Sequence, residues 1–370
     1  MNTKVMAVKP AKPAKPELPI PGRLPPANGT TILAAITLGL IAIGPLFLGD
    51  FASFVGARIA VTAIVGLSIV VVTGYTGQLS LMPYTFVGLG VFVAAHAITS
   101  WDWPFWFAAM LAAALSVPLS LLVGLVSVRL RGFYFAIATL TFASAMGATL
   151  FSWDFFTGGQ KGLQVDRPVL GPIDLTSDRA FYLLTLVTVL ALVWMVMGLR
   201  ESRIGRAMTS VRENEIAAAT MGVNVMKTKL VAFVVSGMIA TVGGVFQGML
   251  LQQVTRTPYQ TPFVETLGVT LVILVVVGGM RSAWGPFIGA ALIYVQLEVF
   301  RTALFLQYFI AAITAAAFIF VLLKLPGGVA GLIKHEAAQV RAAPLKNGIR
   351  VAIIILANVA VFYLIWELSQ

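Results

Sequence analysis

Cysteine is absent from this 370-residue chain, which excludes disulfide bonds and thiolate metal sites. Only two histidines occur, His96 and His335, and they do not have the spacing of a metal-ligand set. No phosphate-binding loop of the G-x-x-x-x-G-K-[ST] type occurs either, so we expect that the chain does not hydrolyse ATP itself. We therefore expect no enzyme activity, no metal site and no cofactor bound by this chain.

Charge is also scarce, because 11% of the residues are charged whereas 59% are hydrophobic, with a mean hydropathy of +0.94. A single soluble core cannot hide so much apolar surface, which indicates an integral membrane protein. The net charge of +11 is typical of some nucleic-acid-binding proteins. The Lys and Arg residues, however, fall in short loops between apolar runs, and membrane topology explains them better than a nucleic-acid partner does.

Long apolar runs are abundant, and a membrane-spanning helix needs about 20 residues. Eleven candidate spans cover approximately residues 31–48, 59–73, 84–99, 104–128, 132–153, 180–199, 230–254, 266–280, 284–297, 302–323 and 351–366. We expect an all-α polytopic membrane protein with about 10–11 transmembrane helices. None of these spans contains Asp, Glu, Lys or Arg, which disfavours coupling to an ion gradient. The last span is short and contains Asn358, so an interfacial hairpin is an alternative for it.

Orientation follows from the basic residues, which collect before residue 31, at Arg129 and Arg131, and in residues 200–229 and 324–350. The positive-inside rule places these stretches in the cytoplasm, and alternation through the spans keeps them all on one side. The loop of residues 154–178, rich in aspartate, is then external. We expect a disordered cytoplasmic tail in residues 1–30 and a transmembrane domain in residues 31–333. We expect residues 334–370 to form a basic linker and an extra C-terminal span.

One uncharged stretch is interrupted near residues 74–83, where glycines and Pro83 break the apolar run. This pattern indicates a discontinuous helix, which membranes tolerate only beside protein or a water-filled cavity. A short buried connection is the alternative. The residues that we expect along a substrate path are Gly74, Gly77, Gln78, Ser80 and Gln247. The polar members of this set are equally interpretable as interhelical hydrogen-bond partners.

Residues 200–229 form the only long, charged, helix-like segment, and it lies between two apolar runs. Ser210 and Glu213 have the spacing of a capping box, and Gly222 is placed to end a helix of about three turns. The small side chains of Ala217 and Ala218 permit close approach. We interpret the segment as a docking surface for a soluble partner, with an ordinary cytoplasmic loop as the alternative.

Six motifs, taken in order, resemble one family. They are GYTGQLSLMPYTFVGLGVF from residue 74, RGFYFAIATLTF from 131, WDFFTGGQKGL from 153, ESRIGRAMTSVRENEIAAATMGVNV from 201, VVVGGMRSAWGPFIGA from 275 and LPGGVAGLI from 325. Together they resemble the permease subunits of LIV-type branched-chain amino acid ABC importers, in particular the longer of the two permease types. The resemblance covers roughly residues 59–333. Met82 and Pro83 depart from the Gly-His that the family commonly has there.

The resemblance implies a multi-pass protein of the bacterial inner membrane with a cytoplasmic N-terminus. Its partners would be membrane lipid, a second homologous permease, two cytoplasmic ATPases that hold ATP and Mg, and a periplasmic or lipid-anchored substrate-binding protein. The positions that match the family's ATPase-coupling loop are Arg212, Glu213, Asn214, Glu215, Ala217, Ala218 and Gly222. Thr157, Gly158 and Gly159 would face the binding protein.

The implied function is that of the permease subunit of an ATP-driven importer for branched-chain or other small amino acids. A coupling helix on the cytoplasmic side would switch the access of the path from one side of the membrane to the other. The alternatives are a stand-alone secondary transporter or channel, a membrane scaffold, and an importer of the same type for urea, amides or aromatic acids.

Overall fold

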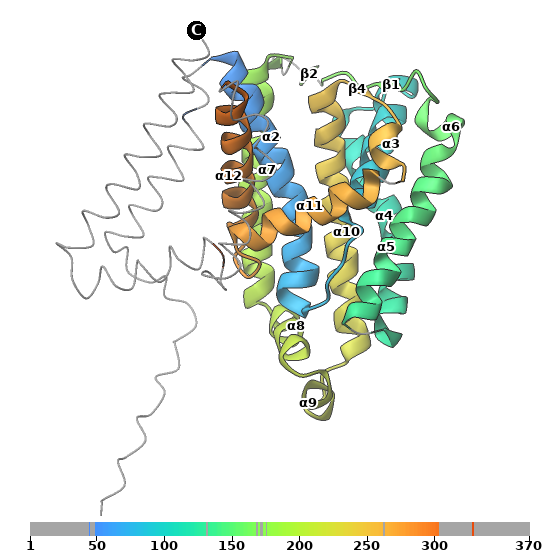
Figure 1. Cartoon of the computed structure of the whole chain (residues 1–370), viewed down its shortest axis with the longest axis vertical. Helices are drawn as coiled ribbons and strands as arrows, with labels where there is room; N and C mark the ends of the chain where they lie inside the picture. The colour runs from blue at the N-terminus through green and yellow to red at the C-terminus, as the bar shows by residue number, and fades with distance from the viewer. Residues whose placement is uncertain are drawn as a thin grey trace, which may run out of the picture.

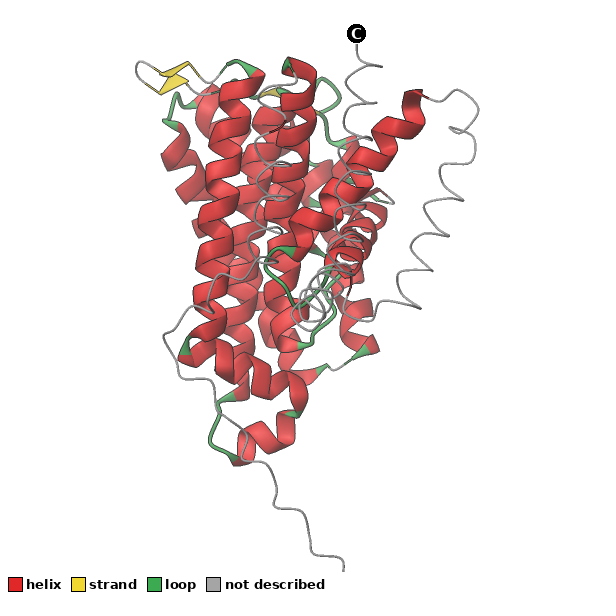
Figure 2. Cartoon of the chain, turned by 90° about the vertical axis from the view of Figure 1, so that its left-hand side faces the viewer, coloured by secondary structure: helices red, strands yellow, loops and turns green. Residues whose placement is uncertain are grey.

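The chain forms a bundle of helices, seen in the computed structural model of Figure 1. The structure describes residues 44, 49–130, 132–167, 169–170, 173–174, 176–261, 263–302 and 328. In this part of the chain every strand is two residues long, and helices make up the body of the molecule (Figure 2). The prediction of an all-α polytopic membrane protein is confirmed.

Six helices are long and apolar enough to cross a membrane within the described residues. They are α2 (Asp50–Ile69) with its π-helical end (Val70–Tyr75), α3 (Pro83–Ala95) with the π-helical turn His96–Ser100, α4 (Phe105–Arg129), α5 (Phe133–Ala148) with the 3-10 turn Leu150–Ser152, α7 (Asp178–Glu201) and α10 (Val225–Leu251). Two shorter helices follow, α11 (Phe263–Gly278) and α12 (Gly285–Thr302). Each corresponds to a predicted span. The predicted span at 351–366, that at 31–48 apart from residue 44, and that at 302–323 apart from its first residue lie outside the described residues.

Several predicted boundaries are wrong, because charged residues were assigned to loops. Helix α2 starts at Asp50 and not at residue 59, and it therefore contains Arg58. The Asp50 carboxylate pairs with Arg179 at 3.0 Å, and the Arg58 guanidinium lies 4.8 Å from the centre of the Tyr294 ring. Helix α11 starts early enough to include Glu265, whose Oε1 accepts a hydrogen bond from Ser144 of α5. These helices therefore carry charged residues that the predicted spans lacked.

Helices α2, α3 and α10 form the centre of the bundle. In their most apolar 18-residue windows 83%, 78% and 56% of residues are buried, against 33% to 39% in α4, α5 and α7. The outward faces of α5 and α7 carry large exposed side chains such as Phe133 and Trp194. The buried helices therefore hold the interior, and the apolar faces of the outer helices are suited to lipid or to a second membrane subunit.

Glycines allow α3 and α10 to pack backbone against backbone. A Cβ atom added to Gly244 would overlap the carbonyl oxygen of Val87, and one added to Gly90 would overlap that of Thr241. Gly289 likewise lies against the Leu274 carbonyl oxygen. Gly244 and Gly289 thus let helices of this chain approach closely.

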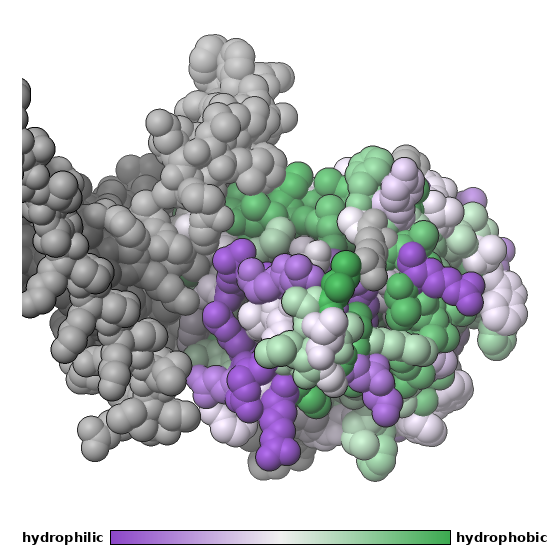
Figure 3. Space-filling view, turned by 90° about the horizontal axis from the view of Figure 1, so that it is seen from below, coloured by the Kyte–Doolittle hydropathy of each residue, from purple (hydrophilic) through white to green (hydrophobic). Residues whose placement is uncertain are grey.

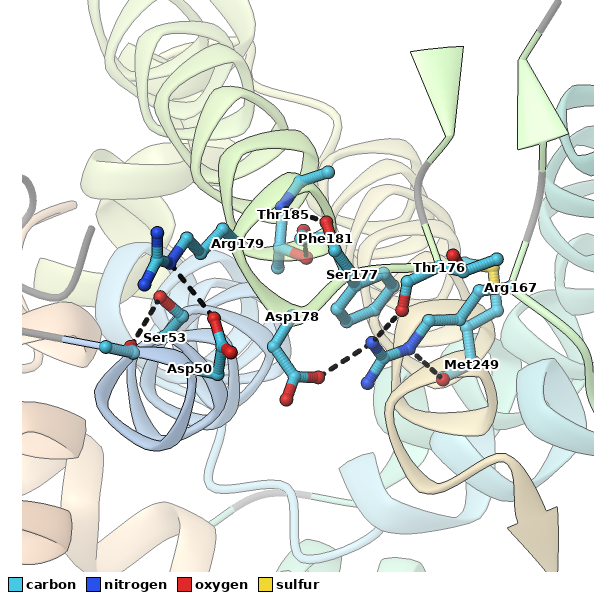
Figure 4. A network of polar contacts seen from close by, with 12 residues as sticks. Asp50, Ser53, Arg167, Thr176, Ser177, Asp178, Arg179, Phe181, Thr185 and Met249 are labelled. Atoms are coloured by element: carbon cyan, nitrogen blue, oxygen red, sulfur yellow. Dashed lines mark hydrogen bonds and ion pairs between the residues drawn. The ribbon is translucent and has the colours of Figure 1, made fainter. Parts of the chain in front are cut away.

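At one end of the bundle, residues 154–178 form a loop that is tied to the helix ends. Helix α6 (Asp154–Thr157) starts it, and strand β1 (Leu163–Gln164) pairs with β4 (Gln253–Val254), while β2 (Val169–Leu170) pairs with β3 (Ile173–Asp174). Arg167 is buried and its Nη1 contacts the Asp178 carboxylate at 2.7 Å and the Thr176 carbonyl oxygen at 2.8 Å (Figure 4). This network joins the loop to the start of α7, near the start of α2.

Residues 200–229 lie at the opposite end of the bundle from this loop (Figure 1). Helix α8 (Arg203–Glu213) and helix α9 (Glu215–Thr220) project there beyond the long helices. The described helices therefore place the basic segment and the aspartate-rich loop on opposite sides, as the alternation of spans predicts. Which side faces the cytoplasm stays a prediction.

Candidate functional site

The projecting segment consists of two helices, not the single helix that we predicted. Ser210 lies inside α8, where its hydroxyl donates to the Arg206 carbonyl oxygen, so the capping box with Glu213 is wrong. The cap is instead Asn214, whose Oδ1 accepts from the backbone N–H groups of Ile216 and Ala217, both at 3.0 Å. Asn and Ser are similarly good N-caps, and the extended backbone of Asn214 (φ −159°) ends α8 and starts α9 at one residue.

Gly222 ends α9 as predicted. Its φ of +83° is a left-handed conformation that glycine adopts without strain. Its N–H donates to the Ala219 carbonyl oxygen, and the N–H of Val223 donates to that of Ala218, each at 3.0 Å, which closes the helix end. Helix α9 spans six residues and is therefore shorter than the predicted three turns.

The outer surface of α9 is apolar although it lies at the end of the bundle where hydrophilic side chains gather (Figure 3). Ile216 is 68% exposed and Met221 is 84% exposed, and Ala217 between them is also exposed, while Ala218 faces inward and is buried. Neither Ile216 nor Met221 was among the residues predicted from the sequence. Their signal was a pair of large apolar residues flanking an alanine run in the most charged segment. Exposed apolar side chains rimmed by polar ones favour a docking surface.

The predicted discontinuity between α2 and α3 is confirmed. The π-helical turn Val70–Tyr75 ends α2, residues 77–82 are not helical, and α3 starts with Pro83 at its first position. Gly77 has a φ of +74°. The freed backbone is satisfied by protein, since the Leu81 N–H donates to Thr139 Oγ1 of α5 at 3.1 Å and the Gly77 N–H donates to the Thr73 carbonyl oxygen at 3.2 Å. We name residues 76–82 the break.

The break and the projecting segment meet, although they are far apart in sequence. Arg212 Nη1 donates a hydrogen bond to the carbonyl oxygen of Gly74 at 2.8 Å, and Arg212 Nη2 pairs with Glu213 Oε1 at 2.9 Å. A cavity of about 260 Å³ lies between the two segments. It is lined by residues 76–78, by Leu130, Gly132 and Phe135 between α4 and α5, and by residues 211–216. The predicted coupling residues and part of the predicted path therefore share one site.

The five predicted path residues do not form one line. Gly77 and Gln78 line the cavity, and the buried Gln78 Oε1 has no hydrogen-bond partner among the described residues. Ser80 is buried within the break. Gly74 packs so tightly that a Cβ atom there would overlap the Met280 carbonyl oxygen. Gln247 lies apart from them on α10, and a path through all five stays a prediction.

Gln247 belongs to a second polar cluster at the start of α3. Its Nε2 donates to the Tyr84 hydroxyl at 2.8 Å, and the Tyr84 ring stacks on that of Tyr259, with 5.4 Å between the ring centres. Tyr259 is fully buried. This cluster joins α3, α10 and the loop after β4, beyond the break.

A buried ion pair, which sequence analysis did not predict, attaches α9 to the bundle. Lys229 of α10 is fully buried, and its Nζ lies 2.5 Å from Glu215 Oε1 and donates to the Ser127 carbonyl oxygen of α4 at 3.3 Å. In the sequence, Lys229 has the character of a loop lysine of the basic stretch. Only the fold places it inside the bundle, where it joins α9 to α10 and α4.

The predicted external contact residues form a turn at the opposite end. Thr157 is buried and its hydroxyl donates to the Trp153 carbonyl oxygen, while Gly158 and Gly159 have φ values of +71° and +63°. His96 Nε2 lies 2.9 Å from the Phe156 carbonyl oxygen, so this histidine is packed against the same loop. Contact of the turn with a binding protein stays a prediction. No group of three or more His, Asp or Glu side chains in the described part of the chain is placed to hold a metal ion.

Comparison with known proteins agrees with the resemblance seen in the motifs. Residues 51–357 match the family described as the permease component of branched-chain amino acid transport systems. The LivM permease protein of the high-affinity branched-chain amino acid transport system of Salmonella typhimurium is 28% identical over 306 residues, which are 75% of this chain and 71% of that protein. LivM of Escherichia coli is 27% identical over 299 residues, 74% of this chain and 64% of that protein.

A shorter similarity links the chain to the other permease type. A probable branched-chain amino acid transport permease protein, LivH, of Methanocaldococcus jannaschii is 32% identical over 113 residues, 30% of this chain and 33% of that protein. Against LivM, by contrast, the matched segments span about two thirds of the relatives' length. No solved structure matches the chain.

Proposed function

We propose, from the fact that this chain belongs to the family of branched-chain amino acid transport permeases, that it is one of two membrane subunits of an ATP-driven importer. Its substrate would be a branched-chain or another small amino acid, handed over by a periplasmic or lipid-anchored binding protein. The other permease would be a homologue of the LivH type, and two cytoplasmic ATPases would hold ATP and Mg. The protein would lie in the bacterial inner membrane with its N-terminus in the cytoplasm.

The observation that carries the proposal is the apolar tip of α9. Ile216 and Met221 are exposed at the end of the bundle that also carries the basic residues of the 200–229 segment. Small alanines between them let a partner approach the helix backbone closely, and the charges around the segment keep it out of the hydrocarbon core. A short, capped, water-exposed helix with an apolar tip suits insertion into a groove of a soluble subunit.

Closure of the ATPases would then displace α9. Because Lys229 and Glu215 join α9 to α10 and α4, and because α10 packs on α3 through glycine contacts, the displacement would reach the break without a flexible link. Such movements of packed helices switch a cavity between two accessible sides. The chain would supply the path and the transmission, and its partners would supply the ATP hydrolysis.

A secondary transporter is the second candidate, and Glu265 is the observation that favours it. A carboxylate within an apolar helix, hydrogen-bonded to Ser144, is the kind of group that ion-coupled carriers use. If Glu265 carried a coupling ion, Glu265→Gln would abolish transport. The proposed ATP-driven importer instead retains ATP-dependent uptake in this variant, since Gln also forms a hydrogen bond with Ser144.

Docking through α9 is tested by co-purification of the chain with its ATPases from the native membrane. We expect Ile216→Glu together with Met221→Glu to lower ATPase recovery by about tenfold, because docking would then bury the charges of the two introduced glutamates in the groove. Ser210→Glu adds a charge to an exposed position of α8 and serves as the control, with unchanged recovery. Equal recovery of the ATPases with both variants would remove α9 as the docking helix.

A further inference from the structure

Arg212 lies in the projecting segment, yet its side chain points away from the surface where a soluble partner would dock. The side chain is only 16% exposed, and its guanidinium reaches the end of α2. The acceptor, the carbonyl oxygen of Gly74, is 138 residues away in sequence. Arg212 is thus a contact between the projecting segment and a membrane-spanning helix.

The end of α2 needs such a partner for a physical reason. The last carbonyl groups of a helix find no backbone N–H donor within that helix, and they form the negative end of the helix dipole. Here the carbonyl oxygens of Val72 and Thr73 accept from residues of the following turn, whereas that of Gly74 accepts from the Arg212 guanidinium. A cation at this position satisfies the carbonyl and the dipole together.

The break is shaped to admit the arginine. A Cβ atom at Gly77 would lie 2.5 Å from Arg212 Cγ, so any side chain at residue 77 would displace the arginine stem. The π-helical turn Val70–Tyr75, where Gly74 lies, is a departure from regular helix that often marks a functional site. Arginine, π turn and glycine together form one fitted contact.

We propose that Arg212 is a positioning residue that transmits movement of the docked segment to the break, by holding or releasing the C-terminal end of α2. The proposal rests on the proposed function, since it assigns the residue through which ATPase closure acts on the path. When α8 and α9 move as a unit, the guanidinium carries the Gly74 carbonyl with it or leaves it uncapped. Either change alters the shape of the cavity that residues 76–78 line.

The experiment uses the complete importer in proteoliposomes and measures ATP hydrolysed per substrate molecule transported. Arg212→Gln, which keeps a polar side chain but shortens it and removes the charge, should raise this ratio by about tenfold, within the usual range of coupling between sites. Arg212→Lys should give a smaller rise, because one ammonium can still reach the Gly74 carbonyl. Arg206→Gln is the matched control, because Arg206 also donates to a backbone carbonyl, that of Glu201, but within its own segment.

A second readout reports the break directly. Since the chain has no cysteine, Ser80→Cys places its only thiol at a buried position of the break. With native Arg212, the rate of labelling by a water-soluble maleimide should change when ATP and Mg are added. With Arg212→Gln, that rate should no longer depend on nucleotide. A purely structural role for Arg212 would lower the yield of the complex without removing this dependence.

The outcomes separate the two proposals. If the complex with native Arg212 shows no ATP-dependent uptake, the proposed function fails, and the role of Arg212 fails with it. If that complex transports and Arg212→Gln keeps both the ratio and the nucleotide-dependent labelling, the role of Arg212 is overturned and the importer stands. If Arg212→Gln does not assemble, Arg212→Lys decides, and an unchanged ratio in that variant overturns the role as well.

Discussion

The buried pair of Lys229 and Glu215 allows a quantitative test of how α9 is held. Lys229 is 1% exposed and Glu215 is 20% exposed in their side chains, with 2.5 Å between Nζ and Oε1. Breaking a fully buried ion pair by removing one partner destabilises a protein by about 3–5 kcal/mol. Because Glu215 keeps some contact with water, we take about 2–3 kcal/mol for Lys229→Met.

This energy predicts a large change in the local opening of α9. A loss of about 2–3 kcal/mol corresponds to a shift of roughly 30- to 150-fold in the equilibrium between attached and detached α9. Hydrogen exchange of the α9 backbone amides, followed by mass spectrometry, measures this equilibrium without unfolding the membrane helices. Lys229→Met should accelerate exchange in α9 by that factor. Lys227→Met, at an exposed position of α10, the helix that also carries Lys229, should leave exchange in α9 unchanged.

The double variant is decisive. Lys229→Met with Glu215→Gln removes both charges, so no unpaired buried charge remains and exchange in α9 should return to within about threefold of the native rate. The two single variants and the double variant form a cycle that isolates the interaction. If the effects of the single changes simply add in the double variant, the pair does not hold α9, and the transmission that we describe loses its anchor.

Three further predictions concern packing, the helix end and orientation. Gly244→Ala should lower the free energy of unfolding in detergent by about 1–3 kcal/mol because its methyl group overlaps a backbone oxygen, whereas Gly198→Ala, with open space around it, should not lower it. Gly222→Ala should destabilise the end of α9 by about 1–2 kcal/mol because of its left-handed backbone, seen as faster exchange there; no change would contradict the cap. In right-side-out vesicles, an impermeant maleimide should label Lys161→Cys but not Lys227→Cys; the reverse pattern would invert the orientation.

The positions of the long apolar helices in the described part of the chain could be predicted from the sequence, because length and composition alone mark segments that are able to cross a membrane. Their boundaries could not be predicted where a charged residue finds a partner in another helix. Asp50 pairs with Arg179, and Arg58 lies over the Tyr294 ring, so both are part of α2. Both residues are exposed, and helix propensity gave no reason to extend the helix through them.

The site was predicted in part, and for similar reasons. The break followed from glycine and proline chemistry, which is local, and so did the cap at Gly222. The local sequence could not show whether Ser210 or Asn214 is the cap, because both residue types are good caps. The contacts of Arg212 with Gly74 and of Lys229 with Glu215 join segments that only the folded chain brings together. No periodicity or spacing reveals them.

Uptake of a labelled branched-chain amino acid into proteoliposomes tests the central claim most directly. The vesicles contain this chain, a second permease, the ATPases with enclosed ATP and Mg, and a loaded binding protein outside. We predict uptake that requires ATP and stops when either the ATPases or this chain is omitted. Uptake by this chain alone, driven by an ion gradient without ATP, would contradict the account and identify a secondary transporter.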